Sequence, residues 1–185
     1  RDRSISFASL GYSVICVDPN KPVTHANDAG ADLRTTAFLQ PAKHFMQSLD
    51  LWAELKSYAV PMEIMRIIDA AGKNWPPKEK TTKDFLSSDI SDLPFGWNIP
   101  NWLLRRAFTE KANKYSNLEL KFGLTTSSFI RRDDAAFVYL DDGSQIKAKL
   151  VIGADGRNSF IRKKSQIKIS RTEFSQKALT LSLIH

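Results

Sequence analysis

The residues with the clearest chemical potential lie in a glycine-containing stretch toward the C-terminal end of the sequence. The apolar run Leu150-Val151-Ile152 leads directly into Gly153-Ala154-Asp155-Gly156. Glycines let the backbone approach a ligand closely, and an aspartate at the end of a strand can accept hydrogen bonds from ribose-type hydroxyls. Ser159 and Arg162 follow at the start of a predicted helix, whose first amides suit a phosphate. The alternative is an ordinary strand-to-helix turn in which Asp155 caps the helix.

A second acidic residue, Asp18, follows the apolar run Val14–Val17. In dinucleotide-binding folds, an acidic residue at the end of the second strand takes the adenosine ribose hydroxyls. The alternative is an aspartate that opens a turn before Pro19. The sequence therefore offers two candidate hydroxyl acceptors, each at the end of a predicted strand.

The elements that would position Asp18 are predicted from the first sixty residues. The pattern indicates the end of a helix at Ser4–Leu10, closed by Gly11, and then a strand at Tyr12–Val17. A further helix is expected from Thr35 onward, with Pro41 near its start. Its apolar face would consist of Phe38, Phe45, Leu49, Trp52 and Leu55.

The middle of the sequence alternates between strand and helix patterns. Met62–Asp69 has the composition of a strand, and Gly72–Lys83 is polar and lysine-rich, which suggests an exposed connection. A helix should follow, capped by Asn98 or Asn101. Leu118–Phe122 is the next expected strand.

A β-hairpin is predicted directly before the glycine-containing stretch. Ala136–Leu140 and Gln145–Ile152 flank the turn Asp141-Asp142-Gly143-Ser144, whose residue types suit a tight turn. The second strand of this hairpin would lead without interruption into Gly153.

The string from Leu150 to Arg162 resembles the aspartate-glycine fingerprint of FAD-dependent aromatic hydroxylases, the group A flavoprotein monooxygenases. In that family the aspartate lies near both FAD and the pyrophosphate of NAD(P)H. The resemblance therefore assigns Asp155 to the cofactor, together with the flanking Gly153 and Gly156. Ser159 and Arg162 match later positions of the fingerprint.

The front of the sequence is similar to the same family but lacks one of its parts. Ser9-Leu10-Gly11-Tyr12 looks like the tail of the phosphate-binding helix, which supports a cofactor role for Asp18. The glycine-rich loop that precedes this helix in the family does not occur in the sequence, and neither does the family's second aspartate motif. We therefore expect a chain truncated at both ends that binds FAD poorly or not at all by itself.

Two further stretches are similar to the ubiquinone-biosynthesis hydroxylases within this family. Gly30–Ala37 resembles the loop that carries an FAD-contacting arginine, which would be Arg34. Phe95–Leu104 resembles the segment leading into the helix that flanks the flavin, where Asn101 and Arg105 would meet the cofactor. The alternatives are a surface arginine at Arg34, and a cap or an exposed helical side chain at the other two.

The resemblance implies an α/β fold: a partial Rossmann-like FAD-binding domain, similar to para-hydroxybenzoate hydroxylase, with part of a β-sheet substrate domain. Residues 1–58 and 95–165 would belong to the FAD-binding domain. Residues 59–94 and 166–185 would be fragments of the substrate-domain sheet.

The implied activity is hydroxylation of a polyprenylated aromatic ring in ubiquinone biosynthesis, using FAD, NAD(P)H and O2 through a flavin hydroperoxide. No nucleophile-base pair is expected, because the cofactor carries the chemistry. The implied location is cytoplasmic, with peripheral association at the inner face of the membrane or with a ubiquinone-biosynthesis complex. A related monooxygenase acting on a small soluble aromatic is the alternative within the enzymes.

Charge suggests an alternative from another class. The formal net charge is +7 over 185 residues. Its densest part comprises Arg157, Arg162, Lys163, Lys164, Lys168 and Arg171. A non-catalytic basic module could use such a surface to bind nucleic acid or an acidic partner. We expect no nucleic-acid partner, because aromatic residues are not interleaved with this cluster, and a solvated or membrane-facing surface is favoured instead.

Overall fold

The computed structural model describes residues 2–71, 76–175 and 178 of the chain. The helices are α1 (Asp2–Ser9), α2 (Gln40–Ser48), α3 (Trp52–Leu55), α4 (Asn101–Asn113) and α5 (Phe160–Lys164), with single 3-10 turns η1 (Lys56–Tyr58) and η2 (Ser87–Asp89). The strands are β1 (Val14–Asp18), β2 (Thr35–Leu39), β3 (Val60–Met62), β4 (Ile64–Ala71), β5 (Lys78–Leu86), β6 (Gly96–Pro100), β7 (Leu118–Phe122), β8 (Thr126–Arg131), β9 (Ala136–Leu140) and β10 (Gln145–Ala148).

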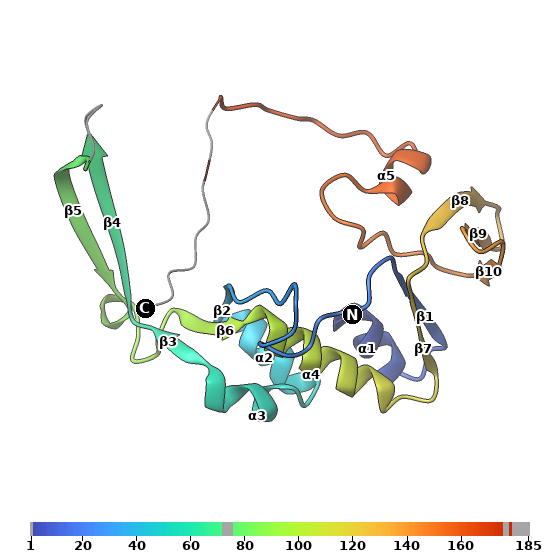
Figure 1. Cartoon of the computed structure of the whole chain (residues 1–185), viewed down its shortest axis with the longest axis horizontal. Coiled ribbons are helices and arrows are strands. Elements are labelled where there is room, and N and C mark those ends of the chain that lie inside the picture. The colour runs from blue at the N-terminus through green and yellow to red at the C-terminus, as the bar shows by residue number, and fades with distance from the viewer. Residues whose placement is uncertain (1, 72–75, 176–177, 179–185) are drawn as a thin grey trace.

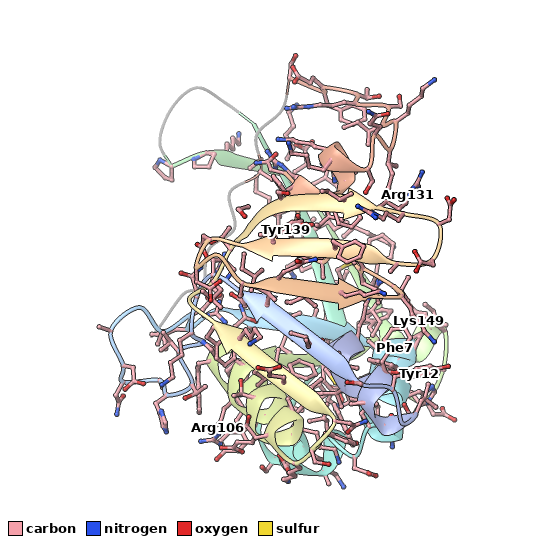
Figure 2. The ribbon with its side chains drawn as sticks, turned by 90° about the vertical axis from the view of Figure 1, so that its right-hand side faces the viewer. Phe7, Tyr12, Arg106, Arg131, Tyr139 and Lys149 are labelled. Carbon is pink, nitrogen blue, oxygen red and sulfur yellow. The ribbon has the colours of Figure 1, made fainter. Side chains whose placement is uncertain are left out.

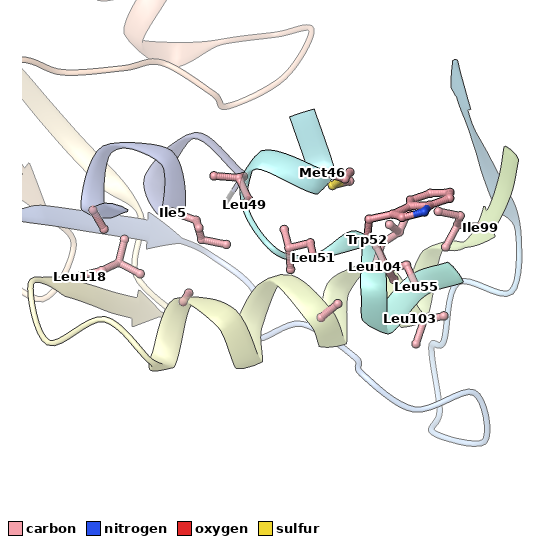
Figure 3. Close-up of a cluster of buried hydrophobic side chains, with 13 residues drawn as sticks. Ile5, Met46, Leu49, Leu51, Trp52, Leu55, Ile99, Leu103, Leu104 and Leu118 are labelled. Atoms are coloured by element: carbon pink, nitrogen blue, oxygen red, sulfur yellow. The ribbon is translucent and has the colours of Figure 1, made fainter. Parts of the chain in front are cut away.

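The hydrophobic core lies where four helices meet two of the sheets (Figures 1 and 3). Helix α4 runs through its centre and buries Leu103, Leu104 and Ala107 on one face, at helical spacing. The other buried members are Ile5, Ala8, Met46, Leu49, Leu51, Trp52, Leu55, Ile99, Ala112 and Leu118. Burial of this apolar surface is the main force that fixes α4, and with it the side chains at the start of that helix.

Strand β1 pairs in parallel with β7, in the register Val14↔Leu118 to Asp18↔Phe122. The predicted helix end and strand at the front of the chain are confirmed as α1 and β1. Gly11 ends the helix in the left-handed region, with φ of 86°, as a glycine does more easily than other residues. The side-chain amide of Asn117 donates to the carbonyl oxygens of Ala8 (2.9 Å) and Tyr12 (2.8 Å), which ties this turn to the start of β7.

Three more sheets complete the fold (Figure 1). Strands β2, β6 and β3 form an antiparallel sheet with β6 in the centre, and β4 and β5 form a hairpin that projects away from the helices. Strands β8, β9 and β10 form an antiparallel meander, in which Figure 2 shows Arg131 at the end of β8 and Tyr139 in β9. The predicted hairpin turn is confirmed between β9 and β10, where Gly143 has a φ of 84°.

The helix expected from Thr35 is wrong for its first five residues, which form strand β2. They pair with β6 in the register Thr35↔Pro100 to Leu39↔Gly96. The helix begins only at Gln40, beside Pro41. Phe38 packs against the core from β2 and Trp52 packs in it from α3, so the apolar residues assigned to one helical face belong to different elements that share one core.

Two further element predictions are corrected. The exposed connection expected over Gly72–Lys83 is a strand from Lys78 onward, because β5 forms an antiparallel ladder with β4; residues 72–75 lie outside the described residues. The strand expected over Gln145–Ile152 ends at Ala148, where the chain bends at Lys149. The apolar run before Gly153 is therefore not part of a ladder among the described residues.

Helix α4 is present as predicted, but neither expected asparagine caps it. Pro100 occupies the N-cap position, and Asn101 is the first residue of the helix. The N–H of Asn101 donates to the carbonyl oxygen of Arg34 (2.9 Å), and the N–H of Trp102 donates to that of Asp32 (3.2 Å). The loop before β2 therefore satisfies the first amides of α4 with its own backbone, which replaces a side-chain cap.

Candidate functional site

The first part of the candidate site is centred on the Asp32 carboxylate, at the point where the loop before β2 meets the start of α4. Arg34 donates to it through Nε (2.8 Å to Oδ1) and Nη2 (2.8 Å to Oδ2). Asn101 Nδ2 donates to Oδ2 at 3.0 Å, and Arg105 Nη2 lies 3.4 Å from the same oxygen. Three residues predicted to meet the cofactor are thus brought together by a fourth that was not predicted.

The backbone and a threonine complete this Asp32 cluster. The N–H of Arg34 donates to Asp32 Oδ1 at 3.2 Å, which forms a tight local turn. The hydroxyl of Thr36 donates to Asn101 Oδ1 at 2.5 Å, which fixes the orientation of the amide group. Both oxygens of Asp32 are therefore occupied by donors from the loop and from α4.

The charges in the cluster are unequally exposed. The Asp32 side chain is 13% exposed, whereas those of Arg34 and Arg105 are 55% and 39% exposed. The guanidinium of Arg34 holds the pKa of Asp32 well below its usual value, and this effect, helped by Asn101, outweighs the opposing effect of burial. Two guanidinium groups contact one carboxylate, so the three groups together have a net charge of +1. The two arginines are the more exposed members and present this charge to solvent. Such a surface suits an anionic ligand.

The second part of the site is the turn that leads into α5. Ser159 is buried and occupies the N-cap position: its hydroxyl accepts from the N–H of Arg162 (3.0 Å) and donates to Asp155 Oδ1. The N–H of Ile161 donates to Asp155 Oδ2 (3.1 Å). Burial is the largest single effect and would raise the pKa of Asp155, but the hydrogen bonds from Ser159 and Ile161, together with those from the backbone of Asp155 and Phe160, lower it on balance. Asp155 does not occupy the N-cap position, although it accepts from a first-turn amide, and its side chain is exposed.

Glycine is favoured at two positions of this turn for different structural reasons. A Cβ at Gly153 would lie 3.0 Å from the Cβ of Ile161 and 3.3 Å from Asp155 Oδ1, so a side chain here would have to displace Ile161 slightly. Gly156 has open space around it but a φ of 80°, a conformation that other residues adopt at a cost. Both glycines are thus accounted for by the shape of the turn that presents Asp155.

A hollow of about 490 Å³ lies between the β8–β9 strands and this turn. Gly153, Ser159 and Arg162 line it from the turn. Arg131 at the end of β8 and Lys149 just after β10, both labelled in Figure 2, line it from the side of the meander. Arg162 also donates from Nη2 to the carbonyl oxygen of Arg157 at 2.6 Å, which holds its side chain across the turn. The lining is more basic than acidic, in keeping with an anionic group nearby.

Asp18 lies at the end of β1 and is half-buried. Its Oδ1 accepts from the N–H of Asn20 (2.9 Å), and its carbonyl oxygen accepts from Gly123 just beyond β7 (3.0 Å). The first of these bonds is the turn expected of an aspartate before a proline. Among the described residues β1 pairs with β7 and not with the run before Gly153, so the structure does not join Asp18 and Asp155 through neighbouring strands.

The predicted site residues thus form two clusters and one separate aspartate. Arg34, Asn101 and Arg105 belong to the Asp32 cluster. Gly153, Asp155, Gly156, Ser159 and Arg162 belong to the turn before α5. Sequence reasoning missed Asp32 and Thr36, although both lie in the stretch Gly30–Ala37 that drew attention to Arg34.

The fold is a mixed α/β unit in which a parallel strand pair and an antiparallel meander lie beside a helical core. The FAD- and substrate-bound flavin-dependent monooxygenase PieE superposes on it with a TM-score of 0.71, at 15% identity, over 91% of this chain and 30% of that chain. This likeness establishes the fold and confirms the predicted fold class.

Residues 10–184 match the family described as FAD binding domain, and the chain belongs to that family. It is 26% identical to ubiquinone hydroxylase UbiL of Rhodospirillum rubrum over 180 aligned residues. This alignment covers 97% of this chain and 40% of the relative. It is 23% identical to the 3-demethoxyubiquinol 3-hydroxylase of Escherichia coli, over 97% of this chain and 44% of the relative. The chain thus spans less than half the length of these two curated relatives, and the predicted resemblance to the ubiquinone hydroxylases is confirmed.

Proposed function

We propose that the protein is an FAD-dependent monooxygenase that hydroxylates a polyprenylated aromatic ring in ubiquinone biosynthesis. The overall reaction consumes the ring, O2, NAD(P)H and a proton, and yields the hydroxylated ring, water and NAD(P)+. The proposal is supported by membership of the FAD binding domain family and by the names of the two relatives. The observation that carries it is the Asp32 cluster, which presents two guanidinium groups on one side of a fixed carboxylate.

The donor set of the Asp32 cluster fits FAD, because the pyrophosphate of FAD is an anion with several acceptor oxygens. Arg34 uses Nε and Nη2 on Asp32, and among the described residues no hydrogen bond involves its Nη1. We propose that Arg34 and Arg105 bind the cofactor phosphates and that Asn101 lies beside them. FAD held by these residues would supply the redox chemistry, namely acceptance of a hydride from NAD(P)H and activation of O2.

The remaining predicted residues would bind the hydroxyl-bearing parts of the cofactors. Asp18 at the end of β1 is proposed to accept from the adenosine ribose. Asp155, whose pKa is lowered by its hydrogen bonds, is proposed to accept from a further hydroxyl of FAD. Arg162 and the turn at Gly153 and Gly156 would then lie close to the pyrophosphate of NAD(P)H.

We further propose that residues 1–58 and 95–165 form the FAD-binding part and that 59–94 and 166–185 belong to the substrate-domain sheet. Residues 176–177 and 179–185 of the last segment lie outside the described residues. The projecting hairpin β4–β5, with its many exposed apolar side chains, supports a role in a larger sheet.

We place the protein in the cytoplasm, in peripheral contact with the inner face of the membrane or with a ubiquinone-biosynthesis complex. None of the helices in the described part of the chain has the length and hydropathy of a membrane span. A polyprenylated substrate must nevertheless be drawn from a lipid phase. The basic residues in and after α5, of which Lys163, Lys164 and Lys168 are exposed, suit an anionic lipid surface.

The experiment that tests the proposal supplies the purified protein with FAD, NAD(P)H and isotopically labelled O2. Polyprenylated phenols and short soluble phenols are offered in parallel, and incorporation of the label is read by mass spectrometry. Label in the polyprenylated ring supports the proposal. Label in soluble phenols alone would transfer the assignment to a different monooxygenase. Salt-dependent binding of nucleic acid without any binding of FAD would favour the basic binding module.

A further inference from the structure

The Asp32 carboxylate is surrounded too completely to serve as a ligand-binding group itself. Oδ1 accepts from the backbone N–H and Nε of Arg34. Oδ2 accepts from Arg34 Nη2 (2.8 Å), from Asn101 Nδ2 (3.0 Å) and, at longer range, from Arg105 Nη2 (3.4 Å). With five donors around two oxygens, few lone pairs remain for a ligand. Any role of Asp32 must therefore act through the groups that it holds.

The geometry of the pair fixes the plane of the Arg34 guanidinium. Two parallel N–H···O bonds form the fork that arginine and carboxylate prefer, and they orient the group as well as bind it. Because the side chain of arginine has a large rotamer entropy, an exposed arginine without such a partner samples many directions. Arg105 projects from the first turns of α4 toward the same carboxylate, so one aspartate sets the separation of two cations.

We propose that Asp32 is a positioning residue that holds Arg34 and Arg105 as a preformed pair for a phosphate group of FAD. This inference rests on the proposed function, since it takes FAD as the anionic ligand. Ordering two long side chains in advance removes part of the entropy cost of binding. The carboxylate also offsets the repulsion between the two guanidinium groups in the absence of the phosphate.

The structure contains a matched control for this role. In the hairpin β4–β5, Arg66 donates to Asp84 through the same two atoms, with Nε at 2.7 Å from Oδ1 and Nη2 at 2.8 Å from Oδ2. This pair joins two exposed strands and has no second arginine among its recorded salt-bridge partners in the described residues. Asp84→Asn therefore changes the same kind of ion pair without changing the Asp32 cluster.

The test compares Asp32→Asn with Asp84→Asn in the purified protein and measures the dissociation constants of FAD and of riboflavin by flavin fluorescence. Riboflavin has the same ring system but no phosphate. Asp32→Asn should weaken FAD binding about tenfold, the size of one charge-assisted hydrogen bond. Riboflavin binding should be unchanged, and Asp84→Asn should alter neither constant. Asp32→Glu, which retains the charge, should recover part of the loss.

A double-mutant cycle separates positioning from a merely structural role. If Asp32 acts through Arg34, the effects of Asp32→Asn and Arg34→Gln on FAD affinity should be less than additive in the double variant. Additive effects, or an equal loss of riboflavin affinity, would overturn the positioning role. Unchanged FAD affinity in Asp32→Asn would also refute it while leaving the proposed function intact. A wild-type protein of the full length of its relatives that binds no FAD would refute both.

Discussion

Ser159→Ala is the perturbation whose consequence follows most directly from the geometry of the turn before α5. The substitution removes a hydroxyl that is 3% exposed and makes two hydrogen bonds. Loss of an N-cap costs about 1 kcal/mol. Loss of a hydrogen bond to a charged group costs about 1.5–3 kcal/mol, and the lower figure applies because Asp155 is exposed and water can replace the serine. Because one hydroxyl makes both bonds, the two losses are not fully additive, and local stability should fall by about 2 kcal/mol rather than by their sum of about 2.5 kcal/mol.

Hydrogen exchange of the α5 amides measures this local stability, because a helix of five residues can open without global unfolding. The amides of Arg162 and Lys163 should exchange about thirtyfold faster in the variant, the factor that corresponds to 2 kcal/mol. The pKa of Asp155, followed by NMR, should rise, because Ser159 is among the groups that lower it. Ser170→Ala, at an exposed serine outside any helix or strand, is the control. Unchanged exchange together with an unchanged pKa would refute the reasoning.

Three other outcomes are expected. Gly96→Ala should prevent the pairing of β2 with β6, because its Cβ would lie 2.2 Å from the backbone oxygen of Phe38; a loss of soluble, cooperatively unfolding protein is the result to look for, and a stable variant would contradict it. Gly153→Ala should cost about 1–3 kcal/mol through crowding of Ile161, measured by chemical denaturation, and a cost near zero would show that the turn relaxes. Because the folded pKa of Asp32 lies below its ordinary value of 3.8, its stabilising effect is complete above that pH and is lost as the pH falls toward the folded pKa. Acid titration of unfolding should therefore be less steep in Asp32→Asn, and identical acid profiles would count against the pKa shift.

The parts of the fold that the sequence predicted are those decided by local patterns. Helix α4 repeats apolar residues at helical spacing, β7 alternates apolar and charged residues with a period of two, and the β9–β10 turn contains a glycine where the backbone requires a positive φ. In each case the residues that determine the element lie within it or next to it. The helix signal of α1 and its end at Gly11 belong to the same group.

The elements that the sequence misjudged are strands that depend on their pairing partners rather than on their own composition. Thr35–Leu39 is a strand because β6, about sixty residues later, supplies a ladder. Lys78–Leu86 is a strand because β4 pairs with it, although most of its side chains are polar and exposed. The partner of β2 lies outside any short window of sequence, whereas the partner of β5 is the preceding strand, and the polar composition of Lys78–Lys83 hid the pairing.

The candidate site shows the same division. Arg34, Asn101 and Arg105 were singled out by resemblance, and the structure gathers them around one carboxylate. Asp32 was missed because its partners Asn101 and Arg105 lie 69 and 73 residues away along the chain. Its spacing from Arg34, two residues, was the one local signal that could have indicated an ion pair.

A crystal structure of the protein with FAD bound tests the central claim most directly. The account predicts the pyrophosphate of FAD within hydrogen-bond distance of Arg34 and Arg105, with both oxygens of Asp32 still on the arginines and Asn101. A cofactor bound elsewhere, with these guanidinium groups turned to solvent, would contradict it.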